Sequence, residues 1–345
     1  MKIIFMGTPD FATFILDELN NAGHDIVLVI TQPDKPRGRS GKLSPSPVKK
    51  WATEHEVPVY QPAKIRDEES IEYLSKIDAD IGVVAAFGQI LPKKILDMPR
   101  FGCVNVHASL LPKYRGAAPI QWAILNGDKK TGVTIMQMGP GLDDGDILLS
   151  REVDLTGNET GGELFDTLAQ LGAKSAVEAL ELIEGGKISP IKQDESLATH
   201  VGMINKSMGL IDWNKPAKEI ERYVRGLNPW PTAYTSLKGK NLKIWQSHVV
   251  SDVEADAGKR DVAKSDNNKS DSNMSDQNKS NNKSDSNKSG EYKSGQVCHI
   301  DKKSLYIMTG DGILSLDEIQ LEGKKRMAVS SFLLGNQLLL GEELG

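Results

Sequence analysis

The sequence predicts an α/β fold, with a Rossmann-like N-terminal domain followed by a small C-terminal β-barrel. Three observations support this prediction. The chain has 345 residues, which is enough for two domains with sizeable cores. Residues 2–31 have the pattern of a strand, a helix and a second strand, which is typical of a parallel sheet. After residue 240, several short apolar segments are separated by turns, as in a closed antiparallel sheet.

The composition is that of a soluble globular protein. Hydrophobic residues make up 39% of the chain, and the formal net charge is -5. This acidity does not exclude a nucleic-acid partner, because a local basic face matters more than the total charge. The two cysteines, Cys103 and Cys298, are too far apart for a metal motif or a convincing disulfide framework. No apolar run is long enough for a transmembrane helix or a signal peptide, so we expect a cytoplasmic protein without membrane contact.

The first strand and helix argue against a dinucleotide site. Residues 2–6 are an apolar strand, and the turn after it contains a single glycine, Gly7. A dinucleotide-binding turn has the pattern G-x-G-x-x-G, which this turn lacks. Thr8 is placed to cap the following helix, and Pro9 to occupy its first position. The apolar face of that helix comprises Phe11, Ile15 and Leu19.

Residues 32–50 form a basic segment that proline and glycine interrupt repeatedly, which predicts a loop. Its cationic side chains outnumber its one acid, Asp34. Such a segment is either a solvated loop or an arm that contacts phosphate. The cations are Lys35, Arg37, Arg39, Lys42, Lys49 and Lys50.

Polar side chains near the ends of two predicted strands define the candidate site. In the strand 103–107, Asn105 and His107 are two residues apart and therefore leave the same face. Residues 133–138 predict another strand, followed by a glycine-rich loop that carries Asp143. Ligands of open α/β sheets bind beyond strand ends. We therefore expect these two strand ends to bring an amide, an imidazole and a carboxylate together.

These three groups suit acyl-type transfer. An asparagine amide can donate to a developing oxyanion, and a histidine can donate to it or move a proton. An aspartate can orient the imidazole, hold water or accept charge. An isolated Asn-x-His pair more commonly caps a turn, so this pattern alone leaves the question open. The close acids Asp143, Asp144 and Asp146 lack spaced histidine or cysteine partners, so we expect no metal.

Longer motifs around these residues resemble those of the folate-dependent formyltransferases. The motifs are NVHASLLPKYRGAAPIQWAI at 105–124 and GVTIMQMGPGLDDGDIL at 132–148. The similarity extends from IIFMGTPDFA near the start to EGKKRM near the end. Within the family, the closest match is to members that formylate methionine on charged initiator tRNA. The resemblance implies an OB-like C-terminal barrel, 10-formyltetrahydrofolate as donor, and a catalytic trio of Asn105, His107 and Asp143.

The resemblance also implies where the donor binds. In the family, a loop matching residues 87–92 helps to hold the pteridine ring, and the segment after His107 runs close to the ligand. The expected donor-binding residues are therefore Phe87, Gly88, Gln89, Ile90, Leu91, Pro92, Ser109, Leu110, Leu111 and Pro112. Next to this segment, we expect Lys113 and Arg115 either to contact phosphate or to be solvated.

In the family, the basic loop and the C-terminal domain contact tRNA. Lysines and arginines outnumber acids between residues 206 and 250. This excess fits a surface that faces phosphate, although ordinary solvation explains it almost as well. The expected tRNA contacts are Arg37, Arg39, Lys42, Lys206, Lys324, Lys325 and Arg326.

We expect residues 1–204 to form the formyltransferase domain and residues 205–345 the tRNA-binding domain. A long amphipathic helix is expected at 162–184. Residues 251–295 interrupt the barrel with imperfect repeats of lysine, serine, aspartate and asparagine. This composition predicts a disordered insertion. A barrel can tolerate it, because the entropy of loop closure grows only with the logarithm of loop length.

The leading hypothesis is a monomeric enzyme that formylates methionyl-initiator-tRNA. A formyltetrahydrofolate hydrolase would use water in place of the amine, and other family members would use small amines. The barrel and the basic loop favour tRNA over these acceptors. A non-catalytic RNA-binding module is the alternative from another class, and the intact trio argues against it.

Overall fold

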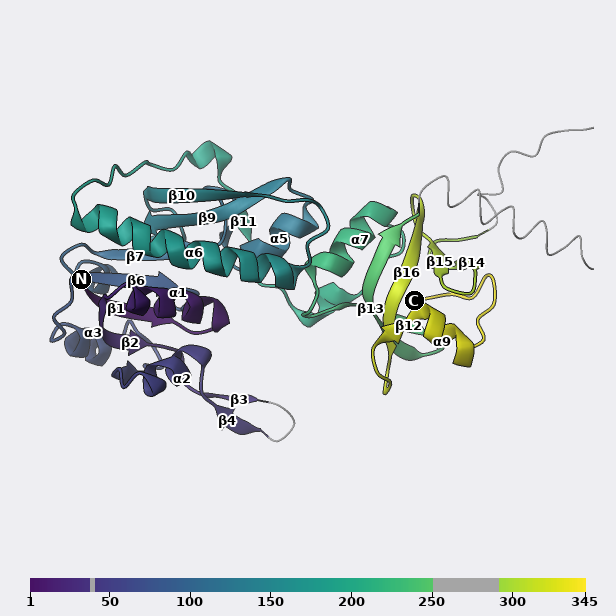
Figure 1. Cartoon of the computed structure of the whole chain (residues 1–345), viewed down its shortest axis with the longest axis horizontal. Coiled ribbons are helices and arrows are strands. Elements are labelled where there is room, and N and C mark those ends of the chain that lie inside the picture. Colours follow the sequence, from purple (N-terminus) through teal and green to yellow (C-terminus); the bar gives the residue numbers. More distant parts are fainter. Residues whose placement is uncertain (38–40, 251–291) are drawn as a thin grey trace, which may run out of the picture. The chain divides into compact units, whose positions relative to one another are not determined.

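The computed structural model describes residues 1–37, 41–250 and 292–345. These residues divide into two compact units, Met1–Ile204 (unit 1) and Asn205–Gly345 (unit 2), and each unit has an apolar core of its own (Figure 1). Arg39 and most of the predicted insertion at 251–295 lie outside the described residues.

Unit 1 contains a mixed seven-stranded sheet in the order β10-β9-β7-β6-β1-β2-β5. Five strands run parallel, whereas β9 and β10 add an antiparallel edge. The α/β class is therefore confirmed. The strands are β1 (Lys2–Gly7), β2 (Asp25–Ile30), β5 (Val59–Tyr60), β6 (Ile81–Ala85), β7 (Cys103–His107), β9 (Lys130–Gln137) and β10 (Ile147–Asp154).

Two apolar layers cover the faces of this sheet. Alternate residues of a strand point to opposite faces, so Ile3 and Phe5 of β1 enter one layer while Ile4 and Met6 enter the other. Helices α1, α2 and α6 contribute to the first layer (Figure 1), and α3 and α4 contribute to the second. The helices are α1 (Asp10–Asn21), α2 (Pro47–Glu54), α3 (Glu68–Leu74), α4 (Lys93–Leu96), α5 (Pro119–Leu125) and α6 (Gly161–Glu184).

Helix α6 confirms the long helix predicted at 162–184. Thr160 and Glu163 form a capping box at its start, in which each side chain bonds to the backbone N–H of the other residue. In its middle, Gly172 faces β7, and a Cβ at that position would lie 3.1 Å from Cγ1 of Val106. The missing side chain lets the helix pack closely against the strand that carries Asn105 and His107.

The first turn differs from the sequence prediction. Helix α1 begins at Asp10, and its N-cap residue, Pro9, makes no side-chain cap. Pro9 has an extended backbone with ψ of 177°, so the helix starts one residue later than predicted. Thr8 does not cap the helix; its Oγ1 donates to the carbonyl of Phe87 at 3.2 Å. The hydroxyl thereby links the ends of β1 and β6.

Residues 32–50 are more regular than the predicted loop. β3 (Lys35–Arg37) and β4 (Lys42–Ser44) pair as an antiparallel hairpin, and α2 then begins at Pro47. The prediction was wrong because proline was treated as a break. Both hairpin strands are edge strands of a two-stranded sheet, and edge strands are where proline is tolerated within a sheet.

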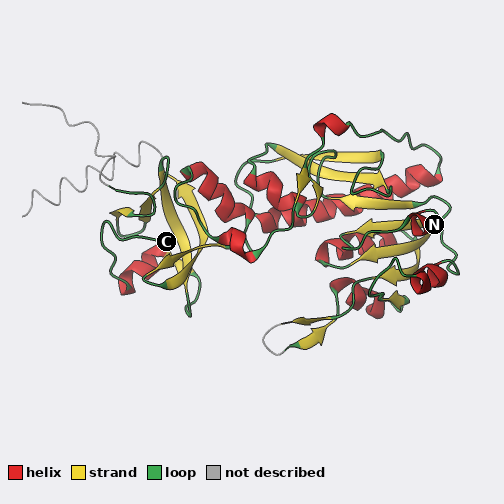
Figure 2. Cartoon of the chain, turned by 180° about the vertical axis from the view of Figure 1, so that it is seen from behind, coloured by secondary structure: helices red, strands yellow, loops and turns green. Residues whose placement is uncertain are grey.

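Unit 2 is an antiparallel β domain, as predicted. Its strands follow the order β12-β13-β16-β15-β14, with β17 paired to β16. Figure 2 shows the contrast: strands dominate unit 2, whereas helices and strands alternate in unit 1. The elements are α7 (Ala217–Gly226), β12 (Ala233–Leu237), β13 (Lys240–Val249), β14 (Val297–Ile300), β15 (Leu305–Met308), β16 (Ile313–Leu321), β17 (Met327–Ala328) and α9 (Val329–Gly335).

The last residues of the chain join the two ends of the unit 2 sheet. Leu344 pairs with Leu237 at the end of β12, and Glu343 pairs with Gln296 just before β14. The segment therefore bridges the first and last strands and closes the sheet in the manner of a barrel. In both units, none of the described helices combines the length and the apolar character needed to cross a bilayer.

Candidate active site

Asn105 and His107 lie on β7, in the interior of the unit 1 sheet. Val104 and Val106 of the same strand are buried in the layer that contains α6. Alternation along the strand therefore directs Asn105 and His107 to the opposite face, as predicted. Both side chains are almost inaccessible, with exposed fractions of 9% and 6%. Buried polar groups of this kind need hydrogen-bond partners.

Asp143 supplies one of these partners, but by a route that differs from the prediction. β9 runs antiparallel to β7, so its last residue, Gln137, lies beside Val104 near the amino end of β7. The expectation that two strand ends meet was therefore wrong, since sequence pattern does not show strand direction. The loop 138–146 returns across the site and closes where the N–H of Gln137 donates to the carbonyl of Asp146 at 2.8 Å.

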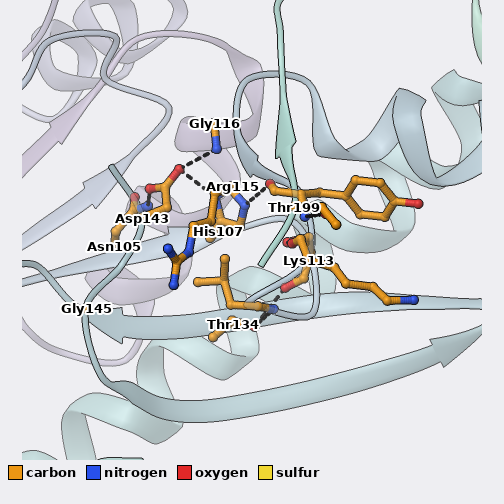
Figure 3. A network of polar contacts seen from close by, with 12 residues as sticks. Asn105, His107, Lys113, Arg115, Gly116, Thr134, Asp143, Gly145 and Thr199 are labelled. Atoms are coloured by element: carbon orange, nitrogen blue, oxygen red, sulfur yellow. Dashed lines mark hydrogen bonds and ion pairs between the residues drawn. The ribbon is translucent and has the colours of Figure 1, made fainter. Parts of the chain in front are cut away.

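The trio meets at the Asp143 carboxylate (Figure 3). The Nδ2 of Asn105 donates to Oδ1 of Asp143 at 3.3 Å. The Oδ2 of Asp143 lies 3.7 Å from Nδ1 of His107 and accepts from the N–H of Gly116 at 2.8 Å. One carboxylate thus contacts an amide, an imidazole and a backbone N–H. This arrangement can stabilise charge and move protons within a few ångströms.

The backbone carbonyl of Tyr114 fixes the imidazole of His107. Nε2 of His107 lies 2.8 Å from this carbonyl oxygen. A carbonyl can only accept, so Nε2 carries a hydrogen and Nδ1 is the nitrogen that faces Asp143. The sequence suggested that the aspartate orients the imidazole. In the structure, the backbone carbonyl of Tyr114 sets the orientation of the ring. Burial raises the pKa of the Tyr114 phenol to about 12, so its hydroxyl stays protonated and donates to Asp128 at 2.7 Å.

Asp143 has a strained backbone. Its φ of 52° lies in the left-handed region, which non-glycine residues rarely adopt. Such a conformation costs about 1–3 kcal/mol and persists where surrounding contacts determine it. Gly116 holds the carboxylate, and the side chain of Gln193 donates to the carbonyls of Asp143 and Gly145 at 2.8 and 2.7 Å. Neither Gly116 nor Gln193 was predicted from the sequence.

The prediction that Arg115 contacts phosphate or solvent was wrong. Arg115 lies on β8 (Arg115–Gly116), is 3% exposed, and pairs with both carboxylate oxygens of Glu195 at 2.7 and 3.0 Å. These hydrogen bonds lower the pKa of Glu195. The pairing depends on β8 lying beside β11 (His200–Val201), 85 residues later in the chain, since His200 is in register with Arg115. No local pattern could indicate that contact. Lys113, by contrast, is exposed.

The expected donor loop, residues 87–92, combines buried residues that anchor it with residues that are exposed to solvent. Phe87 and Leu91 are buried in the second apolar layer. The carbonyl of Phe87 accepts from Thr8 and from Nε2 of Gln32, each at 3.2 Å. Gly88 is exposed with φ of 82°, and Ile90 is 74% exposed. The loop therefore presents its backbone edge outward.

The second expected donor segment, residues 109–112, is partly internal. Ser109 is fully buried, and its hydroxyl donates to the carbonyl of Lys113 at 2.6 Å. The N–H of Leu111 donates to Oγ1 of Thr134 at 3.1 Å. Leu110 and Pro112 are partly exposed. Ser109 and Leu111 thus brace the segment, which leaves Leu110 and Pro112 as its accessible members.

The residues expected to contact tRNA lie on both units. Arg37 and Lys42 are paired in register across the β3–β4 hairpin. Lys206 is exposed in a short 3-10 helix, Lys206–Gly209. Lys324, Lys325 and Arg326 are exposed between β16 and β17.

Arg326 has protein partners of its own. It pairs with Glu318, and its guanidinium lies 4.6 Å from the centre of the Trp245 ring. In the parts of the chain that the structure describes, no group of three or more histidine, cysteine, aspartate or glutamate residues is arranged to hold a metal ion.

Two family models match this chain. Residues 1–180 match the formyl transferase model, and residues 203–337 match the model of the formyl transferase C-terminal domain. Solved structures share the fold. The sugar 3N-formyltransferase WlaRD, solved in the presence of dTDP and 5-N-formyl-THF, has a TM-score of 0.60 at 18% identity, covering 94% of this chain and 99% of that one.

HypX from Aquifex aeolicus, in complex with tetrahydrofolic acid, has a TM-score of 0.58 at 16% identity, covering 97% of this chain. This chain spans about half of HypX, 47% of its length.

Close relatives match from end to end. The methionyl-tRNA formyltransferase of Agathobacter rectalis is 50% identical over 335 residues, covering 97% of this chain and 96% of the relative. That of Lachnospira eligens is 49% identical over 348 residues, covering 100% of both chains. This chain belongs to the methionyl-tRNA formyltransferase family.

Proposed function

We propose that this chain transfers the formyl group of 10-formyltetrahydrofolate to the amino group of methionine on charged initiator tRNA. The observation that carries the proposal is the meeting of Asn105, His107 and Asp143 at one carboxylate. It occurs in a chain that matches methionyl-tRNA formyltransferases along its whole length. The family relationship defines the reaction, and the geometry supports a role for each side chain.

The first step forms a bond between the methionine nitrogen and the formyl carbon. The π electrons of the formyl group move to its oxygen and create an oxyanion. One hydrogen of the Asn105 amide is directed at Asp143, so the second is free to stabilise that oxygen. His107 presents Nδ1 on the same side, because its Nε2 is held by Tyr114. Nδ1 can donate to the oxyanion only when it also carries a hydrogen, so in this proposal His107 acts in its doubly protonated form. We therefore place the oxyanion between Asn105 Nδ2 and the Nδ1–H of His107.

The second step breaks the bond between the formyl carbon and N10 of the folate. The attacking nitrogen must lose one proton and the departing N10 must gain one, so the overall transfer is balanced. Asp143 faces His107 and Asn105 and is the group in this cluster that can accept the first proton. His107 gives its Nδ1 proton to the leaving nitrogen, and the proton held by Asp143 then passes to Nδ1, so both groups return to their starting states.

The donor would bind along the two segments described above. The outward backbone edge of residues 87–92 suits a flat heterocycle with donors and acceptors on its rim, and Leu110 and Pro112 can contact its apolar surface. The fit rests on the anchoring of Phe87 by Thr8 and Gln32, which fixes the loop before the ligand arrives.

The acceptor would use both units. In this proposal, residues 1–204 carry catalysis and residues 205–345 bind tRNA through cationic side chains. The tRNA contacts we propose are Arg37, Arg39, Lys42, Lys206, Lys324, Lys325 and Arg326. We assign the reaction to a monomer in the cytoplasm, where charged tRNA is used.

Single-turnover formyl transfer tests the proposal. The purified protein is mixed with 10-formyltetrahydrofolate and either methionyl-initiator-tRNA, methionyl-elongator-tRNA or no tRNA. We expect formyl-methionine on the initiator tRNA alone. Formate released without formylated tRNA would identify a hydrolase. The absence of both products, with folate or tRNA still bound, would favour a binding module and contradict the proposal.

A further inference from the structure

Gln193 lies behind the active-site loop and uses every hydrogen-bonding site of its amide. It is 5% exposed. Its Nε2 donates to the carbonyls of Asp143 and Gly145, at 2.8 and 2.7 Å. Its Oε1 accepts from Nε and Nη2 of Arg115, at 3.1 and 2.9 Å. An amide offers two hydrogens and two lone pairs, and all four are engaged here.

This pattern fixes which way the amide points. A guanidinium has donors and no acceptor, so Arg115 must face the oxygen of Gln193. The two loop carbonyls can only accept, so they must face the nitrogen. The reversed amide would set donors against donors and acceptors against acceptors. The remaining guanidinium contacts go to Glu195, which holds Arg115 in place.

The dipeptide Arg115–Gly116 therefore holds Asp143 at two points. The N–H of Gly116 donates to the carboxylate directly, and Arg115 holds the backbone carbonyl through Gln193. We propose that Gln193 is a positioning residue for Asp143, and that Arg115 sets the orientation of the Gln193 amide.

This inference rests on the catalytic role proposed for Asp143. When the loop carbonyls lose their donors, Asp143 can relax from a φ of 52° toward a common conformation. Its carboxylate then moves away from Asn105 and His107. The hydrogen bonds of Gln193 go to Arg115 and to the Asp143 loop rather than to the residues proposed to bind the donor or the tRNA, so we expect substrate binding to be unaffected. The expected signature is a lower kcat with KM values for both substrates unchanged.

The substitution Gln193→Glu tests this directly. Glutamate has the same shape and can still pair with Arg115, but it cannot donate to two carbonyls. We expect kcat to fall by about ten- to a hundredfold, as small misplacements of catalytic groups do. Asn228→Asp is the control: the Nδ2 of Asn228 also donates to a backbone carbonyl, that of Trp245 at 3.1 Å, and both residues belong to unit 2 rather than to the Asp143 loop. We expect its kcat to stay within about twofold of the unaltered chain.

A double-mutant cycle separates positioning from general stability. In the background of Asp143→Asn, the further change Gln193→Glu should have little additional effect on kcat, because both act through one group. A full and independent second loss would overturn the inference. If Gln193→Glu does not fold, Gln193→Met keeps the size without the charge, and its thermal midpoint and kcat are read together.

The two proposals fail in different ways. If Asp143→Asn alone retains full turnover, the proposed catalytic trio is wrong whatever Gln193 does. If Asp143→Asn abolishes turnover while Gln193→Glu and Gln193→Met retain it in folded protein, the positioning role is wrong and the trio stands. A raised KM with unchanged kcat in the Gln193 variants would likewise contradict the positioning role.

Discussion

The polar groups of two regions differ in their surroundings. The catalytic trio proposed in unit 1 is largely buried, whereas the basic turn of unit 2, Lys324–Arg326, is exposed. Asn105 and His107 are buried, and each contacts named partners on other segments. Lys324 and Lys325 are exposed at a turn. The effect of a group in the trio depends on its exact position relative to the reacting atoms, so a small displacement removes most of it. A lysine on the turn acts through its charge, which distance and salt weaken gradually. The comparison predicts large kcat effects in one place and graded KM effects in the other.

The largest effect is expected from Asn105→Ala. It removes the amide that we assign to the oxyanion, so kcat should fall by about a hundred- to a thousandfold. Single-turnover transfer to methionyl-initiator-tRNA measures the loss, and circular dichroism confirms the fold. Full turnover in a folded Asn105→Ala variant would break the comparison on the catalytic side.

A smaller effect is expected from the double variant Lys324→Ala/Lys325→Ala. Losing the two phosphate contacts that we propose for these lysines should raise the KM for tRNA by about tenfold, equivalent to about 1.4 kcal/mol, with kcat unchanged. The slope of log affinity against log salt should fall by about one for each lysine. Lys302→Ala/Lys303→Ala, which removes the same charge from another exposed turn of unit 2, is the control. Equal effects of the two double variants on the KM for tRNA would mean that the total charge of unit 2, rather than the position of the Lys324–Arg326 turn, determines the affinity.

The smallest effect is expected from Glu159→Gln. The carboxylate of Glu159 is held by hydrogen bonds, but it lies at the opposite end of β10 from the Asp143 loop. Burial raises its pKa, but hydrogen bonds from Thr156 and Gly157 outweigh this and lower the pKa to about 2. We expect unchanged turnover and a loss of about 1 kcal/mol in the free energy of unfolding at pH 7.

The pH dependence of that loss follows from the sign of the shift. A carboxylate with a lowered folded-state pKa stabilises the fold above its ordinary pKa of 4.5, and this stabilisation disappears as the pH falls toward 2. Chemical denaturation at several pH values should therefore show the two proteins converging in acid. A difference that is constant across this range would mean that the charge of Glu159 contributes nothing.

Sequence pattern was sufficient for the parts of the molecule that depend on local order. Alternation along β7 placed Asn105 and His107 on one face, and apolar periodicity located α6. It failed where distant segments meet. The direction of β9, the link from Thr8 to Phe87 and the burial of Arg115 all depend on which strands lie side by side.

The same reason explains why Gln193 was missed. It is 50 residues from Asp143 along the chain, and a lone glutamine has no motif. The site residues that sequence could suggest were those of one strand and one loop. The residues that hold this loop in place come from the pairing of β8 with β11 and from the segment that precedes β11.

The contact between Arg115 and Gln193 has an evolutionary consequence. Two hydrogen bonds join these buried side chains, so a change at one position removes partners from the other. Lineages that replace Arg115 should therefore also replace Gln193, and the two substitutions should appear together on a phylogenetic tree. The tolerance of this active site to mutation would then be a property of a pair of positions almost 80 residues apart.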